Sequence, residues 1–199
     1  MIANRLKRYN LILASKSPRR QFLLKELGLA FKIQTKDTDE SFPKKLKGKQ
    51  IAYYLCKKKS EAFNNELKPK DLIITADTIV WVKNQVLNKP ANYNEAVKML
   101  KLLSGKMHIV FTGVCLSTLA QNKKTIKTKA FVISTKVFFK KLSNEEINFY
   151  VKNYKPYDKA GAYGAQEWIG YIGVEKIIGS YFNVMGLPMK ELYEALKIF

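Results

Sequence analysis

The sequence predicts a mixed α/β fold, in which helices flank a twisted sheet that contains mostly antiparallel strands. Apolar β-type runs alternate with helical-period segments in the first half of the chain, and that alternation favours strands connected through helices. Two long β-type runs then follow each other with a polar turn between them, which indicates an antiparallel pair. No internal repeat or linker divides the 199 residues. We therefore expect one domain spanning residues 1–199.

The first half of the chain begins with a strand that leads into a capped helix. Residues 10–14 (NLILA) form a short apolar run typical of a buried strand. Ser17 and Pro18 are favoured at a helix N-cap and at the first helical position, and Gly28 ends the helical pattern. The remaining elements expected here are a strand at 31–35, an acidic polar loop at 35–50, a helix at 50–67 and a strand at 72–82.

The second half combines one pair of strands with several helices. The strand pair covers 107–119 and 125–140. Ser143 and Glu146 have the spacing of a capping box, which predicts a helix start at residue 143. The other segments expected are a turn and loop at 84–92, an amphipathic helix at 93–105, a helix at 143–153, an irregular glycine-rich stretch at 155–173 and a final helix at 188–199.

Positive charge is the most unusual feature of the composition. The chain has 36 Lys+Arg against 16 Asp+Glu, a formal net charge of +20. This balance suits an anionic partner such as a nucleic acid, a nucleotide or an acidic membrane surface, or it reflects a lysine-rich solvated surface. The lysines are spread along the whole chain and form no arginine-rich repeat. We therefore favour the solvated surface for most of them.

Cysteine content and hydropathy indicate a cytoplasmic protein. Cys56 and Cys115 are the only cysteines and His108 is the only histidine, so a Cys/His zinc site is excluded. Free buried thiols fit a reducing compartment. The first apolar run is too short for a signal peptide, and no stretch reaches the ~18 apolar residues of a membrane span. We expect a cytoplasmic location and no contact with a membrane.

The segment SKSPRR, residues 15–20, has the features of an anion site. A strand leads through a serine-rich turn into a helix N-terminus, where free N–H groups and the helix dipole favour an anion. Arg19 and Arg20 lie in the first turn, although the dipole disfavours cations there, and they are the only arginines after Arg8. A guanidinium beside free amides suits phosphate or carboxylate groups. The alternative is a pair of solvated surface arginines.

Carboxylates occur at two positions that suit metal or acid–base chemistry. Asp77 lies inside an otherwise apolar β-run. It is either buried and paired, or it faces a cleft as a general base or metal ligand. Glu40 belongs to the loop sequence DTDE, residues 37–40, which suits Mg²⁺ beside substrate phosphates or is an ordinary acidic loop. Metal ligation and acid–base catalysis are thus both open at this stage.

Other polar residues are weaker candidates. Lys59 and Lys89 suit a cleft that binds phosphate, although each alone is typical of a solvated lysine. Gln166 in the glycine-rich stretch carries an amide that can recognise a base edge through its donor and its acceptor. His108 has no partnered nucleophile, and we expect it to be structural. The chain has no GxGxxG fingerprint, P-loop or GxSxG motif, so neither dinucleotide binding nor P-loop or α/β-hydrolase chemistry is indicated.

Eight motifs, taken together and in order, resemble the Maf family of nucleoside triphosphate pyrophosphatases. They cover essentially the whole chain and are LILASKSPRR, DTDE, KKKSEA, ADTIV, LNKP, AVKMLKLLSGKMH, DKAGAYGAQ and SYFNVMGLP. The resemblance implies two lobes with a deep cleft, similar to the inosine triphosphate pyrophosphatases. It also implies hydrolysis of a nucleoside triphosphate to the monophosphate and pyrophosphate, with a divalent cation (Mg²⁺ or Mn²⁺). A homodimer is the assembly it implies.

Within the family, SPRR, ADT and AYGxQ together resemble the branch that prefers dTTP and UTP. The resemblance implies that Arg19, Thr78 and Gln166 set substrate specificity. It also implies that Asp77 is the proton acceptor. The other polar cleft positions that the resemblance implies are Glu40, Lys59 and Lys89.

These implications give a hypothesis for the mechanism. Asp77 activates the attacking water, directly or through a metal that Glu40 helps to hold, because an in-line attack on phosphorus needs a positioned nucleophile. The triphosphate is bound by positive charge and free amides, and the groups proposed for this are Arg19, Lys59, Lys89 and the amides after Ser15. Arg20 is turned by ~100° from Arg19 on the helix, so we expect it to support the fold or the rim of the cleft.

The segment EWIGYIG that follows Gln166 departs from the shorter glycine-rich turn of many members. It leaves the pocket wall near Glu167 and Trp168 undefined at this stage. Two other functions stay open: a basic nucleic-acid-binding protein, and a regulator of cell division (septum formation) that needs no catalysis. A nucleic-acid surface concentrates basic and aromatic residues, whereas the lysines here are dispersed. We therefore expect a small-molecule nucleotide as the partner, and no nucleic acid.

Overall fold

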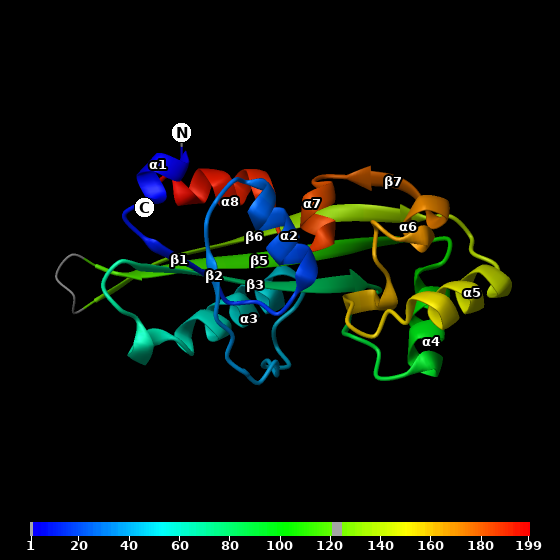
Figure 1. Ribbon diagram of the computed structural model, residues 1–199. Helices are drawn as coiled ribbons and strands as arrows, with labels where there is room; N and C mark the ends of the chain where they lie inside the picture. Colours follow the sequence, from blue (N-terminus) through cyan, green and yellow to red (C-terminus); the bar gives the residue numbers. More distant parts are fainter. Residues whose placement is uncertain (1, 121–124) are drawn as a thin grey trace.

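The computed structural model describes residues 2–120 and 125–199 and is built around one twisted sheet (Figure 1). Within these residues the sheet has seven strands in the order β2-β1-β3-β5-β6-β7, and β4 pairs with β3 outside this path. The strands are β1 (Asn10–Leu13), β2 (Lys32–Ile33), β3 (Asp71–Val82), β4 (Gln85–Leu87), β5 (Met107–Leu119), β6 (Ile126–Phe139) and β7 (Val174–Ile178). β1 runs parallel to β2 and β3, and every other pair is antiparallel. The predicted mixed sheet is confirmed.

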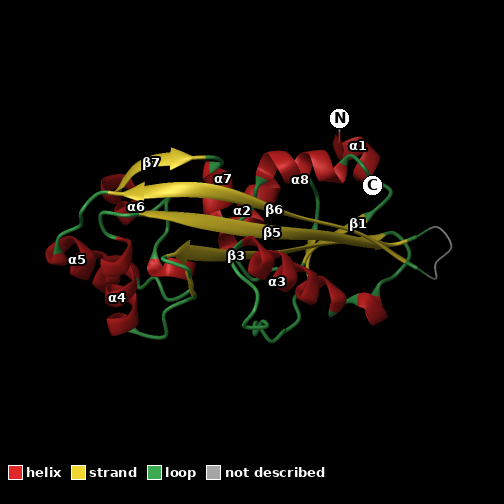
Figure 2. Ribbon diagram, turned by 180° about the vertical axis from the view of Figure 1, so that it is seen from behind, coloured by secondary structure: helices red, strands yellow, loops and turns green. Residues whose placement is uncertain are grey.

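Helices cover both faces of the sheet and one end of its long strands. They are α1 (Ile2–Leu6), α2 (Pro18–Glu26), α3 (Lys49–Glu61), α4 (Tyr93–Leu103), α5 (Asn144–Tyr154), α6 (Trp168–Gly173), α7 (Tyr181–Met185) and α8 (Met189–Leu196), with short 3₁₀ turns η1 (Asn64–Glu66) and η2 (Ala160–Ala162). Figures 1 and 2 show α1, α2, α7 and α8 over one face and α3 over the other. The helices α4, α5 and α6 gather at one end of β3, β5 and β6.

Two hydrophobic cores give the molecule its two lobes. The first lobe packs α1, α2 and α8 against β1 and the first half of β3, with Leu24 and Leu196 fully buried. The second packs α4, α5 and α6 against the other half of β3, with Leu100 and Tyr150 fully buried. Because β3 and β5 contribute to both cores, the long strands join the lobes. The two lobes expected from the family resemblance are therefore present.

The structure differs from the sequence prediction in short elements at the sheet margins. The loop predicted at 84–92 contains β4, which forms a tight hairpin with β3 through Lys83 and Asn84, both at positive φ. The glycine-rich stretch predicted to be irregular ends in α6, and β7 and α7 follow where no element was predicted. The strand predicted at 31–35 shrinks to the two residues of β2, and the helix predicted at 50–67 ends at Glu61. The polar turn predicted between the long strands falls on 121–124, outside the described residues.

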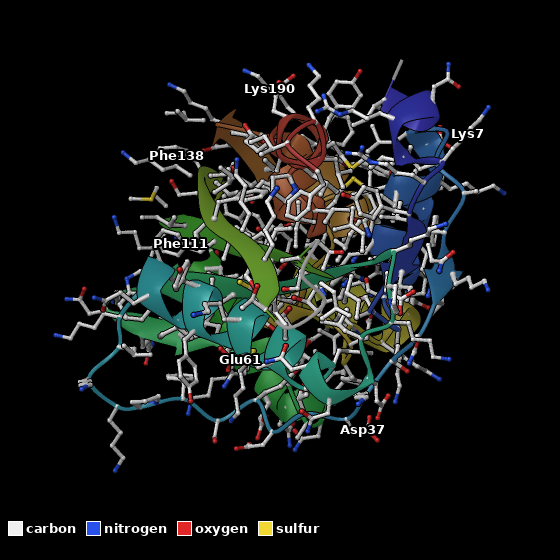
Figure 3. The ribbon with its side chains drawn as sticks, turned by 90° about the vertical axis from the view of Figure 1, so that its left-hand side faces the viewer. Lys7, Asp37, Glu61, Phe111, Phe138 and Lys190 are labelled. Atoms are coloured by element: carbon white, nitrogen blue, oxygen red, sulfur yellow. The ribbon has the colours of Figure 1, made fainter. Side chains whose placement is uncertain are left out.

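Positive charge is distributed over the surface, as the sequence predicts. In Figure 3 nitrogen-tipped side chains surround the outline, and the labelled Lys7 and Lys190 project from its upper part. Among the described residues no helix combines the length and the apolar character that crossing a membrane requires.

Candidate active site

A cavity of about 710 Å³ lies between the two lobes. Its walls come from α2 and the turn before it, the loop after β2, α3, the middle of β3 and the segment 158–166. In Figure 1, α2 lies near the middle of the long strands, between α8 and the group formed by α4, α5 and α6. The cavity brings together all the residues that the sequence singles out: Ser15, Arg19, Glu40, Lys59, Asp77, Thr78, Lys89 and Gln166. Their individual roles stay predictions.

Asp77 lies at the centre of the cavity wall, and Lys59 connects it to Glu40. The Nζ atom of Lys59 is 2.5 Å from Asp77 Oδ1 and 2.8 Å from Glu40 Oε1. Lys89 approaches the other oxygen of Glu40, with Nζ 3.5 Å from Oε2. The Asp77 side chain is 10% exposed. The sequence left two alternatives for Asp77: a buried, paired carboxylate or one that faces a cleft. Both descriptions apply, because Asp77 is paired with Lys59 and also lines the cavity.

Lys59 reaches Asp77 because α3 packs directly on the sheet. Gly113 on β5 lies opposite Asp77 in the sheet register, and a Cβ there would lie 2.2 Å from the carbonyl oxygen of Ala52 on α3. The glycine therefore permits the close approach of the helix. The hydroxyl of Thr75 also donates a hydrogen bond to the carbonyl of Cys56, 2.7 Å away. Both contacts hold α3 against the sheet, and Cys56 lies one turn before Lys59.

Glu40 and Asp77 have the donor chemistry that a divalent cation needs. Their oxygens converge on a single cationic atom, Lys59 Nζ. Mg²⁺ in phosphate-processing sites is commonly held by one or two carboxylates, with substrate phosphates and water completing its shell. No group of three or more His, Cys, Asp or Glu suited to a metal ion occurs among the described residues. The pair therefore fits a cation that substrate oxygens help to bind.

Arg20 is half-buried in the cavity wall and ties α2 to β3 and to the end of α7. Its guanidinium donates to the carbonyls of Ala76 and Gly186, each at 2.9 Å, and to the Thr78 hydroxyl at 3.0 Å. Burial lowers the pKa of Arg20 from its ordinary value, and the charge of Asp77 opposes that effect. Thr78 Oγ1 lies 3.0 Å from Thr112 Oγ1 as well. The hydroxyl of Thr78, a residue that the resemblance links to substrate specificity, is thus already bonded within the fold.

Arg19 reaches across the cavity to the opposite lobe. Its Nη1 atom is 3.0 Å from Asp158 Oδ2, and its side chain is 24% exposed. Asp158 also pairs with Lys159, whose Nζ is 2.7 Å from Oδ1. Burial raises the pKa of Asp158, but the hydrogen bonds and charges of Lys159 and Arg19 outweigh it and hold the pKa below its ordinary value. Arg19 therefore bridges the cavity mouth, whereas Arg20 is bonded to backbone carbonyls and a hydroxyl in the cavity wall.

Sequence reasoning missed the role of Lys159, whose side chain is only 9% exposed although it lines the cavity. Its second carboxylate partner is Glu167, at 3.0 Å, and Glu167 also accepts a hydrogen bond from Tyr150. The only signal in the sequence is a lysine in a glycine-rich motif. Its burial becomes visible only when α5 and the segment 158–167 are packed together.

Comparison with known proteins identifies the family of this chain. The chain matches the profile of the family described as "Maf-like protein" over residues 10–199. The chain belongs to the Maf family. Curated relatives of this Maf chain are named dTTP/UTP pyrophosphatase. They include proteins from Bacteroides thetaiotaomicron (50% identical, covering 99% of each chain), Parabacteroides distasonis (49%, covering 98% of each) and Flavobacterium johnsoniae (48%, covering 98% of each).

A solved structure also aligns with this Maf chain. It is titled nucleoside-triphosphatase / dITP/XTP pyrophosphatase from Mycobacterium abscessus, with a TM-score of 0.36 at 11% identity. The alignment covers 67% of this chain and 75% of the other. This likeness is too low to support a conclusion about function.

Proposed function

We propose that this protein is a nucleoside triphosphate pyrophosphatase that hydrolyses dTTP, UTP and modified analogues to the monophosphate and pyrophosphate. The observation that carries the proposal is the convergence of Asp77, Glu40 and Lys59 in one cavity with the N-terminus of α2. The names of the curated relatives, which span almost the whole chain, support the substrate class. The activity removes triphosphates from the nucleotide pool.

The cavity residues divide the chemical work between water activation and phosphate binding. In the reaction a water oxygen bonds to the α-phosphorus, and the bridging oxygen to the β-phosphorus leaves with pyrophosphate. Asp77 accepts the proton of that water. Lys59, Lys89 and the amides that follow Ser15 bind the phosphate oxygens, whose negative charge grows in the transition state. Arg19 exchanges Asp158 for the substrate at the cavity mouth.

A divalent cation, Mg²⁺ or Mn²⁺, is part of the proposal. When bound, it neutralises charge on the phosphate oxygens, and Glu40 and Asp77 are the residues that would hold it. Lys59 contacts the same two carboxylates, so a cation held by them would leave its ammonium available to the substrate phosphates. We expect chelation of divalent cations to abolish turnover.

We infer a cytoplasmic enzyme that acts on free nucleotides and not on nucleic acid. Cys56 and Cys115 are free and buried, which supports a reducing compartment. Dispersed lysines support a small ligand in preference to a nucleic acid. A homodimer remains a prediction from the family resemblance.

The central test replaces the proposed proton acceptor. We expect Asp77→Asn to lower kcat for dTTP by about 10²–10⁴-fold, the range that a general base contributes, without a fall in the melting temperature that would indicate unfolding. Pyrophosphate release is measured over a panel of nucleoside triphosphates with Mg²⁺ or Mn²⁺.

Two results would contradict the proposal. A folded Asp77→Asn variant with the wild-type rate would remove Asp77 from the mechanism. Turnover of purine triphosphates with none of dTTP or UTP would overturn the substrate class. Salt-sensitive binding of RNA or DNA that survives Asp77→Asn would instead favour the nucleic-acid alternative.

A further inference from the structure

Lys159 is a buried cation in the cavity that the mechanism above does not use. Its side chain is 9% exposed, and its ammonium lies 2.7 Å from Asp158 Oδ1 and 3.0 Å from Glu167 Oε1. The ammonium loses most of its hydration, whereas the side chains of Asp158 and Glu167 stay 56% and 21% exposed, so these pairs add little stability. The cost of removing this ammonium from water has a reason if Lys159 contacts the ligand that the cavity binds.

One of the two carboxylates that hold Lys159, Glu167, is itself fixed. The hydroxyl of Tyr150 donates a hydrogen bond to Glu167, and the backbone N–H of Gly164 donates to the same hydroxyl at 3.1 Å. Burial raises the pKa of Tyr150, with the Glu167 hydrogen bond acting in the same direction, so the phenol stays a donor. Arg19 also pairs with Asp158, but the proposed function exchanges this pair for the substrate. Glu167 is therefore the partner that preorganises the ammonium.

Lys159 and Gln166 both line the cavity, and Glu167 lies near each of them. A Cβ built on Gly164 would lie 3.0 Å from Glu167 Oε2 and 3.1 Å from Gln166 Nε2, so the carboxylate that binds Lys159 lies beside the Gln166 amide. Gln166 Oε1 is buried and has no hydrogen-bond partner among the described residues. Leaving a buried acceptor unpaired is costly, and because Gln166 lines the cavity, a ligand donor there would remove this cost.

A uracil or thymine edge matches these two groups. It presents one donor, N3–H, flanked by the carbonyl acceptors O2 and O4. Gln166 can accept from N3–H, and the ammonium of Lys159 has three N–H donors, of which the two carboxylates use two. Cytosine presents an acceptor at N3 and an amino donor at C4. A glutamine amide can turn over to match that pattern, whereas an ammonium cannot accept a hydrogen bond.

We propose that Lys159 is a specificity-determining residue that donates a hydrogen bond to the O4 carbonyl of uracil or thymine. Glu167 and Tyr150 are positioning residues that hold it in place. This inference rests on the proposed function, because it names the group by which the same site selects its substrate. It also gives a role to the segment after Gln166, which the sequence leaves undefined.

The test compares dTTP with dCTP, both as turnover and as binding. We expect Lys159→Met to lower kcat/KM for dTTP about ten- to a hundredfold, the value of a hydrogen bond from a charged group, and to leave dCTP unchanged or improved. The ratio of the two therefore falls at least tenfold. Lys152→Met makes the same change at an exposed position of α5 and should leave the ratio unchanged. Tyr150→Phe should lower the ratio in the same direction, because Glu167 loses its donor.

A double variant controls for the possibility that Lys159→Met alone disturbs folding. Lys159→Met leaves Glu167 without its cation, whereas the double change Lys159→Met with Glu167→Gln removes both charges of the pair and keeps the side-chain volumes. Folding is checked by thermal melting. If the folded single or double variant keeps the dTTP/dCTP ratio within twofold of the wild type, the inference is wrong.

Calorimetric binding of dTTP and dCTP to Asp77→Asn separates this inference from the proposed function. Selective dTTP binding without any turnover by the wild type would refute the proposed function alone. Selective dTTP binding that persists in Asp77→Asn after Lys159→Met is added would refute the inference alone.

Discussion

The two adjacent arginines of α2 line the same cavity but have different partners. The charge of Arg20 is accepted by the carbonyls of Ala76 and Gly186, whereas Arg19 meets a carboxylate at the cavity mouth. This explains why two cations are tolerated in a first helical turn, where the dipole disfavours them. Each guanidinium has acceptors from other elements that outweigh the unfavourable dipole.

Substitution by lysine should separate the two roles. Arg20→Lys loses the planar fork that reaches three acceptors on β3 and α7, so we expect it to lower the free energy of unfolding by about 2–3 kcal/mol. Arg19→Lys removes only a partly exposed ion pair, worth at most about 1 kcal/mol, but should lower kcat/KM for dTTP more than Arg20→Lys does. Urea unfolding and steady-state kinetics measure the two effects. Equal effects of both variants on both quantities would contradict the assignment.

The site residues that could be predicted from the sequence are those whose amino-acid type is unusual for their position. Asp77 in an apolar strand and Arg19 in a first helical turn break local rules, and both line the cavity. Tyr150 breaks none, since it is one of several aromatic residues on an amphipathic helix. Its hydroxyl matters only because α5 packs against the segment that carries Glu167. Contacts that join distant segments leave no local pattern, so the group around Lys159 could not be predicted.

At the scale of elements, long periodic segments were predictable and short edge segments were not. β5 has the bounds expected from its β-type run, and β6 differs by one residue at each end. β4 follows a turn of Lys83 and Asn84, which lacks the Asn-Gly signal of a two-residue hairpin. β7 pairs only at the sheet edge and is mostly exposed, so it has no apolar alternation. Neither strand has a strong intrinsic signal, and both form because a neighbouring strand offers hydrogen bonds.

The contact between α3 and β5 gives a prediction at this scale. Gly113→Ala places a methyl group 2.2 Å from the carbonyl oxygen of Ala52 and 2.7 Å from its carbon, so backbone must move. We expect a loss of at least ~2 kcal/mol of unfolding free energy, together with lower kcat because α3 carries Lys59. Gly28→Ala is the control, since no atom lies within 4 Å and only its φ of +67° opposes a side chain; it should cost about 1 kcal/mol. Similar losses for both variants in urea unfolding would contradict the close approach.

At the scale of the whole molecule, the active site depends on how two separately packed lobes are held on common strands. β3 and β5 pass through both cores, while the ion pairs Arg19–Asp158 and Lys89–Glu40 connect segments on opposite sides of the cavity. The pairs are partly or largely exposed, and such pairs contribute little to stability. The strands therefore set the geometry of the cleft, and the ion pairs remain available for exchange with an anionic substrate.

The global stability should respond to acid through one buried histidine. His108 on β5 is 1% exposed, and its Nε2 atom lies 2.7 Å from the Tyr163 hydroxyl in the second lobe. Burial lowers the pKa of His108 to about 4. The unfolded chain takes up a proton on this imidazole near pH 6.5, whereas the folded protein does not. The stability is therefore fully present above pH 6.5 and is lost as the pH falls towards 4, at up to about 1.4 kcal/mol per pH unit.

His108→Phe tests this dependence, because phenylalanine keeps an aromatic ring between Phe139 and Tyr163, which both contact the imidazole edge-to-face. The variant loses the Tyr163 hydrogen bond and should be less stable at pH 7.5. Its unfolding free energy should fall less steeply between pH 6.5 and 4.5 than that of the wild type, since the carboxylates titrate in both. Urea unfolding at several pH values measures the difference. As the chain has a single histidine, its imidazole signal in NMR reports the pKa directly, and titration near 6.5 in the folded protein would contradict the prediction.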